Sequence, residues 1–214
     1  MDRLLRRIVA VLLLRPVALL MLGITVKHRG KLPKAGPAII VANHNSHLDT
    51  LVLLSLMPLG LIDKVRPVAA ADYFLKNRVL AWVSLHILNI LPLERGNAAR
   101  GEDPLAESAA ALNRGEILIV FPEGSRGDAE VMGKFKGGVA RLKERFPDLP
   151  IVPVFLQGAG KALPRGEIIL VPVAVDAVVG DPVSWPGNRA QFTADMEAAV
   201  RGLGAHLPRV FDED

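Results

Sequence analysis

The chain has 214 residues, of which 50% are hydrophobic, and it carries a formal net charge of +4 at pH 7. This length is ample for one hydrophobic core and short for two, so we expect a single main domain. The chain contains no cysteine, which excludes disulfide bonds and thiol catalysis.

The positive charge is concentrated at the N-terminus. Residues 1–34 contain eight Lys or Arg and one acidic residue, which gives +7. The whole chain is +4, so residues 35–214 carry −3, from 18 basic and 21 acidic side chains. A basic segment of this kind favours an anionic membrane surface as partner, and we expect no nucleic-acid partner.

The same N-terminal segment holds two apolar runs, Ile8 to Leu14 and Val17 to Leu22, which Arg15-Pro16 interrupts. A spanning helix needs about 20 apolar residues, so the central Arg-Pro disfavours a transmembrane span. No clean small-residue cleavage site follows, which disfavours a signal peptide. We expect residues 3–24 to form interfacial helices on an anionic leaflet. The alternative is a core helix with a basic edge.

Beyond this segment, apolar runs and periodic segments alternate along the chain. The pattern predicts an α/β fold, a single layered domain with a largely parallel or mixed sheet flanked by helices. Strands are predicted near 37–42, 66–70, 88–93, 116–121, 150–156, 166–174 and 176–180. Helices are predicted near 46–57, 73–86, 103–113, 137–146 and 189–206.

The first predicted strand is followed by the segment Asn43-His44-Asn45-Ser46-His47-Leu48-Asp49. Residues five apart on one helix point in different directions, so His44 and Asp49 can meet only if the helix begins between them. His44 would then lie on the strand-to-helix turn, with Asp49 one turn inside the helix. Asp49 could fix the imidazole tautomer and leave the other ring nitrogen free to take a proton.

Two other interpretations fit this segment. Ser46 and Asp49 could form only a capping box at the helix N-terminus, with His44 a loop residue. His44, His47 and Asp49 could instead ligate a metal ion. We expect no metal, because no further His or Cys cluster completes a site.

A second polar loop, Phe121-Pro122-Glu123-Gly124-Ser125-Arg126-Gly127, follows the strand predicted at 116–121. It would expose backbone N–H groups, and the planar guanidinium of Arg126 suits a phosphate. The alternative is an ordinary turn with a surface ion pair. The loop is not the elbow of a serine hydrolase, because Glu123 stands where that motif needs glycine.

From about residue 20 to 185 the sequence resembles the lysophospholipid and glycerolipid acyltransferases, the family of 1-acylglycerol-3-phosphate acyltransferase. Asn43, His44, Ser46 and Asp49 match its first block, the HX4D motif, and Phe121 to Arg126 match its third. Leu91-Pro92-Leu93-Glu94-Arg95 corresponds to the second block, although Pro92 and Glu94 depart from it. Ile151-Val152-Pro153-Val154 matches the fourth.

The resemblance implies that His44 deprotonates the acceptor hydroxyl, which then attacks an acyl thioester directly. Asp49 would orient His44, and no acyl-enzyme or cofactor is implied. The donor co-substrate would be acyl-CoA or acyl-carrier protein. The acceptor would be held by a set of substrate-binding residues, namely Arg95, Glu123, Gly124, Ser125 and Arg126.

We therefore expect residues 35–214 to be an acyltransferase catalytic domain that converts 1-acylglycerol-3-phosphate to phosphatidate in phospholipid biosynthesis. Polybasic segments favour the cytoplasmic face of the inner membrane, where acyl thioesters are made. One alternative keeps the chemistry with another lysolipid acceptor, such as a lyso-ornithine lipid. A second is a non-catalytic lipid-binding module. Lys134 and Lys136 follow the second loop and could add positive field to it, but we expect them to be solvated loop charges.

Overall fold

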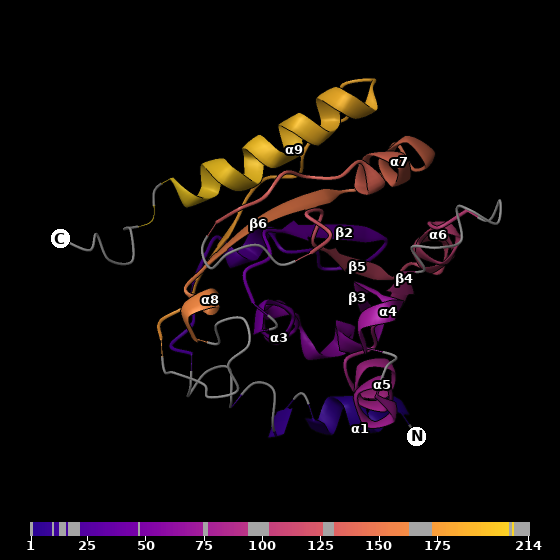
Figure 1. Ribbon diagram of the computed structural model, residues 1–214, viewed down its shortest axis with the longest axis vertical. Helices are drawn as coiled ribbons and strands as arrows, with labels where there is room; N and C mark the ends of the chain where they lie inside the picture. The colour runs from indigo at the N-terminus through magenta and orange to yellow at the C-terminus, as the bar shows by residue number, and fades with distance from the viewer. Residues whose placement is uncertain are drawn as a thin grey trace.

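The computed structural model describes residues 2–9, 11–12, 16, 22–46, 48–74, 77–93, 103–125, 131–162, 173–205 and 207. Within these residues one mixed sheet runs through the molecule, with helices on both faces (Figure 1). The expected α/β fold is therefore present, with a mixed rather than wholly parallel sheet.

The described strands pair in the order β1-β7-β6-β2-β5-β3-β4. Neighbours are parallel at every step except between β6 and β7, which are antiparallel. The strands are β1 (Thr25–Lys27), β2 (Ala38–Ala42), β3 (Val65–Ala70), β4 (Leu91–Leu93), β5 (Ile117–Val120), β6 (Ile151–Gln157) and β7 (Asp176–Val179).

Helices and helical turns connect these strands. The α-helices are α1 (Asp2–Val9), α3 (Leu48–Leu56), α4 (Ala71–Phe74), α5 (Arg78–Trp82), α6 (Ala106–Asn113), α7 (Gly138–Arg145), α8 (Ala159–Ala162) and α9 (Arg189–Gly204). The shorter 3-10 and π elements are η2 (Arg29–Lys31), η3 (Leu59–Lys64) and η4 (Val83–Ile87).

Strand β2 lies at the centre of the sheet, and all five of its residues are buried. Its alternate side chains enter two cores. Ile40 packs with the apolar face of α3, whereas Ile39 and Val41 pack with residues of α6, α7 and α9. A strand buried on both faces explains why Ala-Ile-Ile-Val-Ala is continuously apolar, and it gives the loop that follows a rigid base.

Most predicted elements are present with shifted ends. The helix predicted at 73–86 is divided in the structure, with α4 before residues 75–76, which are not described, and α5 and η4 after them. Strand β1 was not predicted. It lies inside segment 1–34 and pairs with β7, so part of that segment belongs to the sheet. The strand predicted at 166–174 falls mainly on residues that are not described.

The N-terminal segment is described as helix α1 over residues 2–9, while most of 10–21 lies outside the described residues. Among the helices that the structure describes, none has the length and apolarity needed to cross a bilayer. The interfacial helices expected over residues 3–24 therefore stay a prediction.

Gly36, just before β2, closely approaches the backbone of the turn that precedes β5. A Cβ added at Gly36 would lie 2.2 Å from the carbonyl oxygen of Gly115. We expect Gly36→Ala to force these backbones apart and to lower the free energy of unfolding by about 1–3 kcal/mol. Gly30→Ala is the control, because a Cβ there meets nothing within 4 Å. Urea denaturation of both variants measures the effect, and equal stability would contradict it.

Candidate active site

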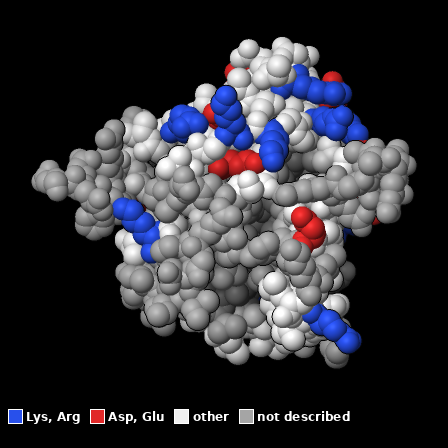
Figure 2. All heavy atoms as spheres, viewed as in Figure 1, with Lys and Arg blue, Asp and Glu red and all other residues white. Residues whose placement is uncertain are grey.

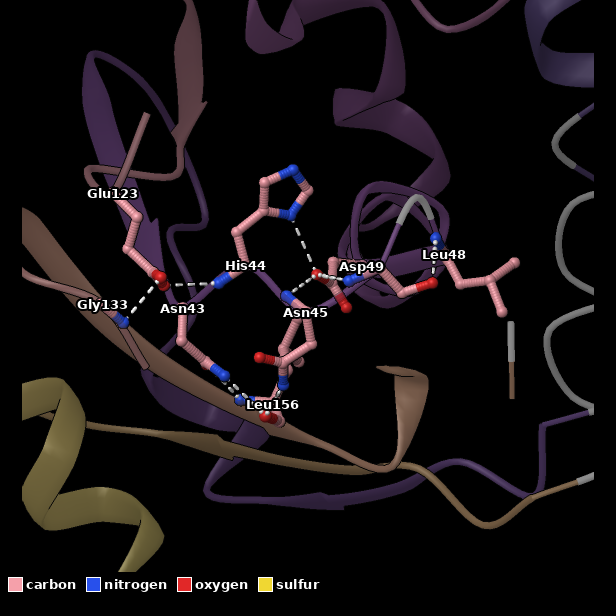
Figure 3. Close-up of polar contacts among 9 residues, drawn as sticks. Asn43, His44, Asn45, Leu48, Asp49, Glu123, Gly133 and Leu156 are labelled. Carbon is pink, nitrogen blue, oxygen red and sulfur yellow. Dashed lines mark hydrogen bonds and ion pairs between the residues drawn. The ribbon is translucent and has the colours of Figure 1, made fainter. Parts of the chain in front are cut away.

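The two polar loops leave the same edge of the sheet. Strands β2 and β5 are parallel neighbours, so the loops that follow them, residues 43–46 and 121–125, begin side by side. Figure 3 shows His44, Asp49 and Glu123 brought together at this point. This is the position at which the open sheets of α/β proteins commonly bind ligands.

His44 and Asp49 form the hydrogen bond that their spacing predicts. His44 lies in the turn, α3 begins at Leu48, and Asp49 is in its first helical turn. Nδ1 of His44 lies 3.0 Å from Oδ2 of Asp49. An ionised carboxylate can only accept, so Nδ1 carries the proton and Nε2 is left as an acceptor. The second ring nitrogen faces away from Asp49 (Figure 3).

The carboxylate of Asp49 is fully buried and is held by several donors at once. Its Oδ2 also accepts hydrogen bonds from the N–H groups of Asn45 and Ser46, each at 2.7 Å. Ser46 Oγ in turn accepts from the N–H of Leu48 at 3.3 Å. The capping arrangement and the histidine contact are therefore both present, since one carboxylate oxygen serves both.

Glu123 ties the two loops together. Its Oε1 accepts from the N–H of His44 at 2.8 Å, and its Oε2 accepts from the N–H of Gly133, also at 2.8 Å. The residue is 6% exposed, so these bonds satisfy a carboxylate that is almost out of solvent. Both of these hydrogen bonds are with backbone N–H groups. Contact of Glu123 with substrate therefore stays a prediction.

The ring of His44 is also held from the side of the second loop. Phe121 stacks on the imidazole with ring centroids 4.1 Å apart and an interplanar angle of 18°. The side chain of His44 remains 18% exposed. The imidazole is thus fixed by a hydrogen bond and by stacking, while part of it can still be reached by a hydroxyl group.

Asn43 extends the pairing of β2 with β6 beyond the end of the strand. Its Oδ1 accepts from the N–H of Leu156 at 2.7 Å, and its Nδ2 donates to the carbonyl of Leu156 at 2.8 Å. Asn45 Nδ2 donates to the same carbonyl at 3.2 Å. In the sequence, Asn43 is identified only as part of the first motif. Its position directly after a buried strand signals that its amide needs partners.

The remaining predicted residues fall into two groups. Gly124 and Ser125 lie in the second loop, where Ser125 is exposed and Gly124 has a φ of +74°. Arg95 and Arg126 lie outside the described residues, as does His47 of the metal alternative. Within the described part of the chain, no group of three or more His, Asp or Glu forms a possible metal site.

Known proteins resemble this chain over the region that contains both loops. A family model described as Acyltransferase matches residues 23–157, which include both loops. A chloroplast 1-acyl-sn-glycerol-3-phosphate acyltransferase of Brassica napus is 29% identical over 160 residues, covering 74% of this chain and 44% of that protein. The 1-acyl-sn-glycerol-3-phosphate acyltransferase alpha of Mus musculus is 28% identical over 199 residues, covering 85% of this chain and 67% of that one.

A solved structure has a similar fold. The crystal structure of the 1-acyl-sn-glycerophosphate (LPA) acyltransferase PlsC from Thermotoga maritima matches with a TM-score of 0.68 at 24% identity. The match covers 85% of this chain and 71% of that one. The present chain spans less than half the length of the Brassica protein.

The hydrogen bonds that Glu123 accepts from the N–H groups of His44 and Gly133 can be tested without an activity assay. In Glu123→Gln the side chain keeps its shape but has one oxygen and one NH2 group, so one of the two N–H donors loses its acceptor. We expect the free energy of unfolding to fall by about 1–3 kcal/mol, and the amide NMR signal of His44 or Gly133 to shift. Glu107→Gln on the exposed face of α6 is the control. Unchanged stability and unchanged amide signals would contradict the bridging role.

Proposed function

The chain belongs to the acyltransferase family, and from this premise we propose that it transfers a fatty acyl group from a thioester to the free hydroxyl of a lysophospholipid. The donor is acyl-CoA or acyl-carrier protein. The acceptor is 1-acylglycerol-3-phosphate, and the product phosphatidate belongs to phospholipid biosynthesis. The observation that carries the proposal is the His44–Asp49 pair, with Nδ1 bound and Nε2 directed away from the carboxylate.

The proposed reaction is a direct transfer. Nε2 of His44 removes the proton of the acceptor hydroxyl while its oxygen attacks the thioester carbonyl carbon. The C–S bond then breaks, and the leaving thiolate takes the proton from the imidazolium. Asp49 keeps the ring in the required tautomer and stabilises its positive charge.

The second loop is proposed to hold the polar head of the acceptor. Gly124 and Ser125 lie in this loop with Ser125 exposed, and Glu123 positions the backbone of His44. Arg95 and Arg126 are proposed as phosphate ligands from the motif resemblance. No metal or cofactor takes part in this proposal.

An acceptor without phosphate is the second candidate. It is favoured by Pro92 and Glu94, which depart from the block that ends in Arg95. Activity on a lyso-ornithine lipid with none on lysophosphatidate would select this candidate. A non-catalytic lipid-binding module is the third, and acyl transfer that depends on His44 would exclude it.

Membrane association is proposed from an apolar surface formed by two helices. Arg6 Nε of α1 donates to the carbonyl of His86 at 2.7 Å, so α1 docks on η4, which directly continues α5. Figure 1 shows α1 and α5 side by side, away from α9. Of the eight exposed large apolar side chains described, seven lie on α1, on α5 or at residues 11–12, which closely follow α1 in the chain: Leu4, Ile8, Val11, Leu12, Val79, Leu80 and Trp82.

This surface, which we call the α1–α5 surface, is basic as well as apolar. Arg6, Arg7 and Arg78 lie on the same helices. Arg6 donates to a backbone carbonyl of η4 and Arg7 pairs with Asp63 at 2.8 Å, while Arg78 is exposed. Apolar side chains together with basic ones suit the interface of an anionic leaflet. In this proposal residues 1–34 are the membrane-associating segment, residues 35–214 are the catalytic domain, and the protein acts at the cytoplasmic face of the inner membrane.

The catalytic proposal is tested by thiol release from a CoA thioester in mixed micelles with lysophosphatidate. We expect His44→Ala and Asp49→Asn to lower turnover by about 10²- to 10⁴-fold, because one removes the base and the other disturbs its tautomer. His28→Asn is the control, since His28 lies in an exposed turn. Full turnover by His44→Ala would remove His44 as the base, and carrier-protein donors should be tested in parallel.

The membrane proposal is tested by sedimentation with vesicles that contain anionic lipid. We expect the double variant Leu80→Glu and Trp82→Glu to lose most vesicle binding, because both side chains are exposed on the α1–α5 surface, at 43% and 50%. Val131→Glu is the control, as Val131 is exposed outside that surface. Equal sedimentation of the double variant and the control would place the lipid contact elsewhere.

A further inference from the structure

Residues 133–136 return to the second loop and are fastened to it at their backbone. The N–H of Gly133 donates to Glu123, that of Phe135 donates to Oε2 of Glu197 at 3.0 Å, and that of Lys136 donates to the carbonyl of Pro122 at 2.9 Å. The side chain of Phe135 is buried. The Cα of Lys136 is therefore held in a fixed position beside the loop that follows β5.

From this position the side chain of Lys136 lies across Gly124. A Cβ added at Gly124 would lie 2.6 Å from Nζ of Lys136 and 3.2 Å from both its Cδ and its Cε. The space that a side chain at position 124 would occupy is thus taken by the lysine. The φ of +74° at Gly124 also favours glycine. The ammonium group is brought over the loop one residue from Glu123, which itself contacts the backbone of His44.

The charge of Lys136 has no acidic partner among the described residues. No ion pair joins Lys136 to a described carboxylate, and Glu123, its neighbour at the loop, directs both oxygens to backbone N–H groups. The side chain of Lys136 is exposed, so burial does not account for its position over Gly124. A cation held over a glycine turn, in the loop next to the one that carries His44 and without a counter-charge among the described residues, is a suitable ligand for an anion.

Lys134 differs from Lys136 although it lies in the same segment. The hydrogen bond from Phe135 holds the pKa of Glu197 below its usual value, and the positive charges of Arg201 and Lys134 lower this pKa further. Lys134 therefore has a carboxylate on α9 close by. Figure 2 shows Lys and Arg side chains gathered over α7 and α9, with an acidic group among them. Because it lies near Glu197 of α9, Lys134 serves as the matched control.

We propose that Lys136 binds a phosphate monoester, that of the lysophospholipid acceptor, and so selects acceptors that carry phosphate. This inference rests on the proposed function and names the substrate class of the same site. In 1-acylglycerol-3-phosphate two carbon atoms separate the free hydroxyl oxygen from the phosphate oxygen. When the hydroxyl is at Nε2 of His44, the phosphate must lie close by, and Lys136 supplies a positive charge on the adjoining loop. This role goes beyond the expectation that Lys136 is a solvated charge, with which its exposure agrees.

The test compares Lys136→Gln with Lys134→Gln in the full-length protein at one ionic strength. Initial rates are measured against lysophosphatidate at saturating CoA thioester, and then against the thioester at saturating acceptor. We expect Lys136→Gln to raise the apparent KM for lysophosphatidate about 10- to 100-fold, as for loss of a charge-assisted contact. The KM for the thioester should stay as in the wild type. Lys134→Gln should resemble the wild type, and Lys136→Arg should recover part of the lost affinity.

A binding measurement separates this inference from the proposed reaction. Calorimetric titration with glycerol 3-phosphate, and with glycerol as the uncharged reference, reports the anion site without turnover. Weaker binding of glycerol 3-phosphate by Lys136→Gln supports the inference. It does so even if the wild type transfers no acyl group, because the absence of transfer would overturn only the proposed reaction. Unchanged KM and unchanged binding in Lys136→Gln overturn the inference. A rise only in the KM for the thioester also overturns it, because the phosphates of CoA would then be the ligand.

Discussion

The arrangement of the site depends on one buried oxygen atom, Oδ2 of Asp49. It accepts from Nδ1 of His44 and from the N–H groups of Asn45 and Ser46. A carboxylate that is fully removed from water is costly unless donors surround it. The turn after β2 supplies two of these donors, and the imidazole supplies the third. The same atom therefore fixes the turn, the start of α3 and the direction of the histidine ring.

The sequence predicts this local geometry well, because its causes are local. The five-residue spacing of His44 and Asp49 requires a helix that starts between them, and α3 starts there. Strands β2, β5 and β6 are predicted close to their observed ends, since each is a short apolar run bounded by polar or turn residues. Helix α9 is predicted as 189–206 and observed as 189–204, with Asn188 capping its first turn.

Contacts between distant parts of the chain could not be predicted in this way. Asn43 pairs with Leu156, 113 residues away, and His44 with Glu123, 79 residues away. A sequence pattern gives each loop its polar residues but not the partner of each polar atom. Strand β1 has three residues of exposed and intermediate burial, so no apolar run marks it. The side chain of Lys136 lies over Gly124 because residues 133–136 return to the loop, a path that no periodicity indicates.

The division of roles between the two loops follows from the sheet. The loop after β2 carries His44, the proposed base, and the loop after β5 carries Gly124 with Lys136 above it. Adjacent strands lie about 4.8 Å apart, so the two loops begin within about the length of a glycerol unit of one another. Glu123 then holds them in register by bonding the backbone of His44 and of Gly133. In this view the distance between proton acceptor and anion site is set by strand pairing. In the proposed reaction this spacing favours an acceptor whose charge lies close to its hydroxyl.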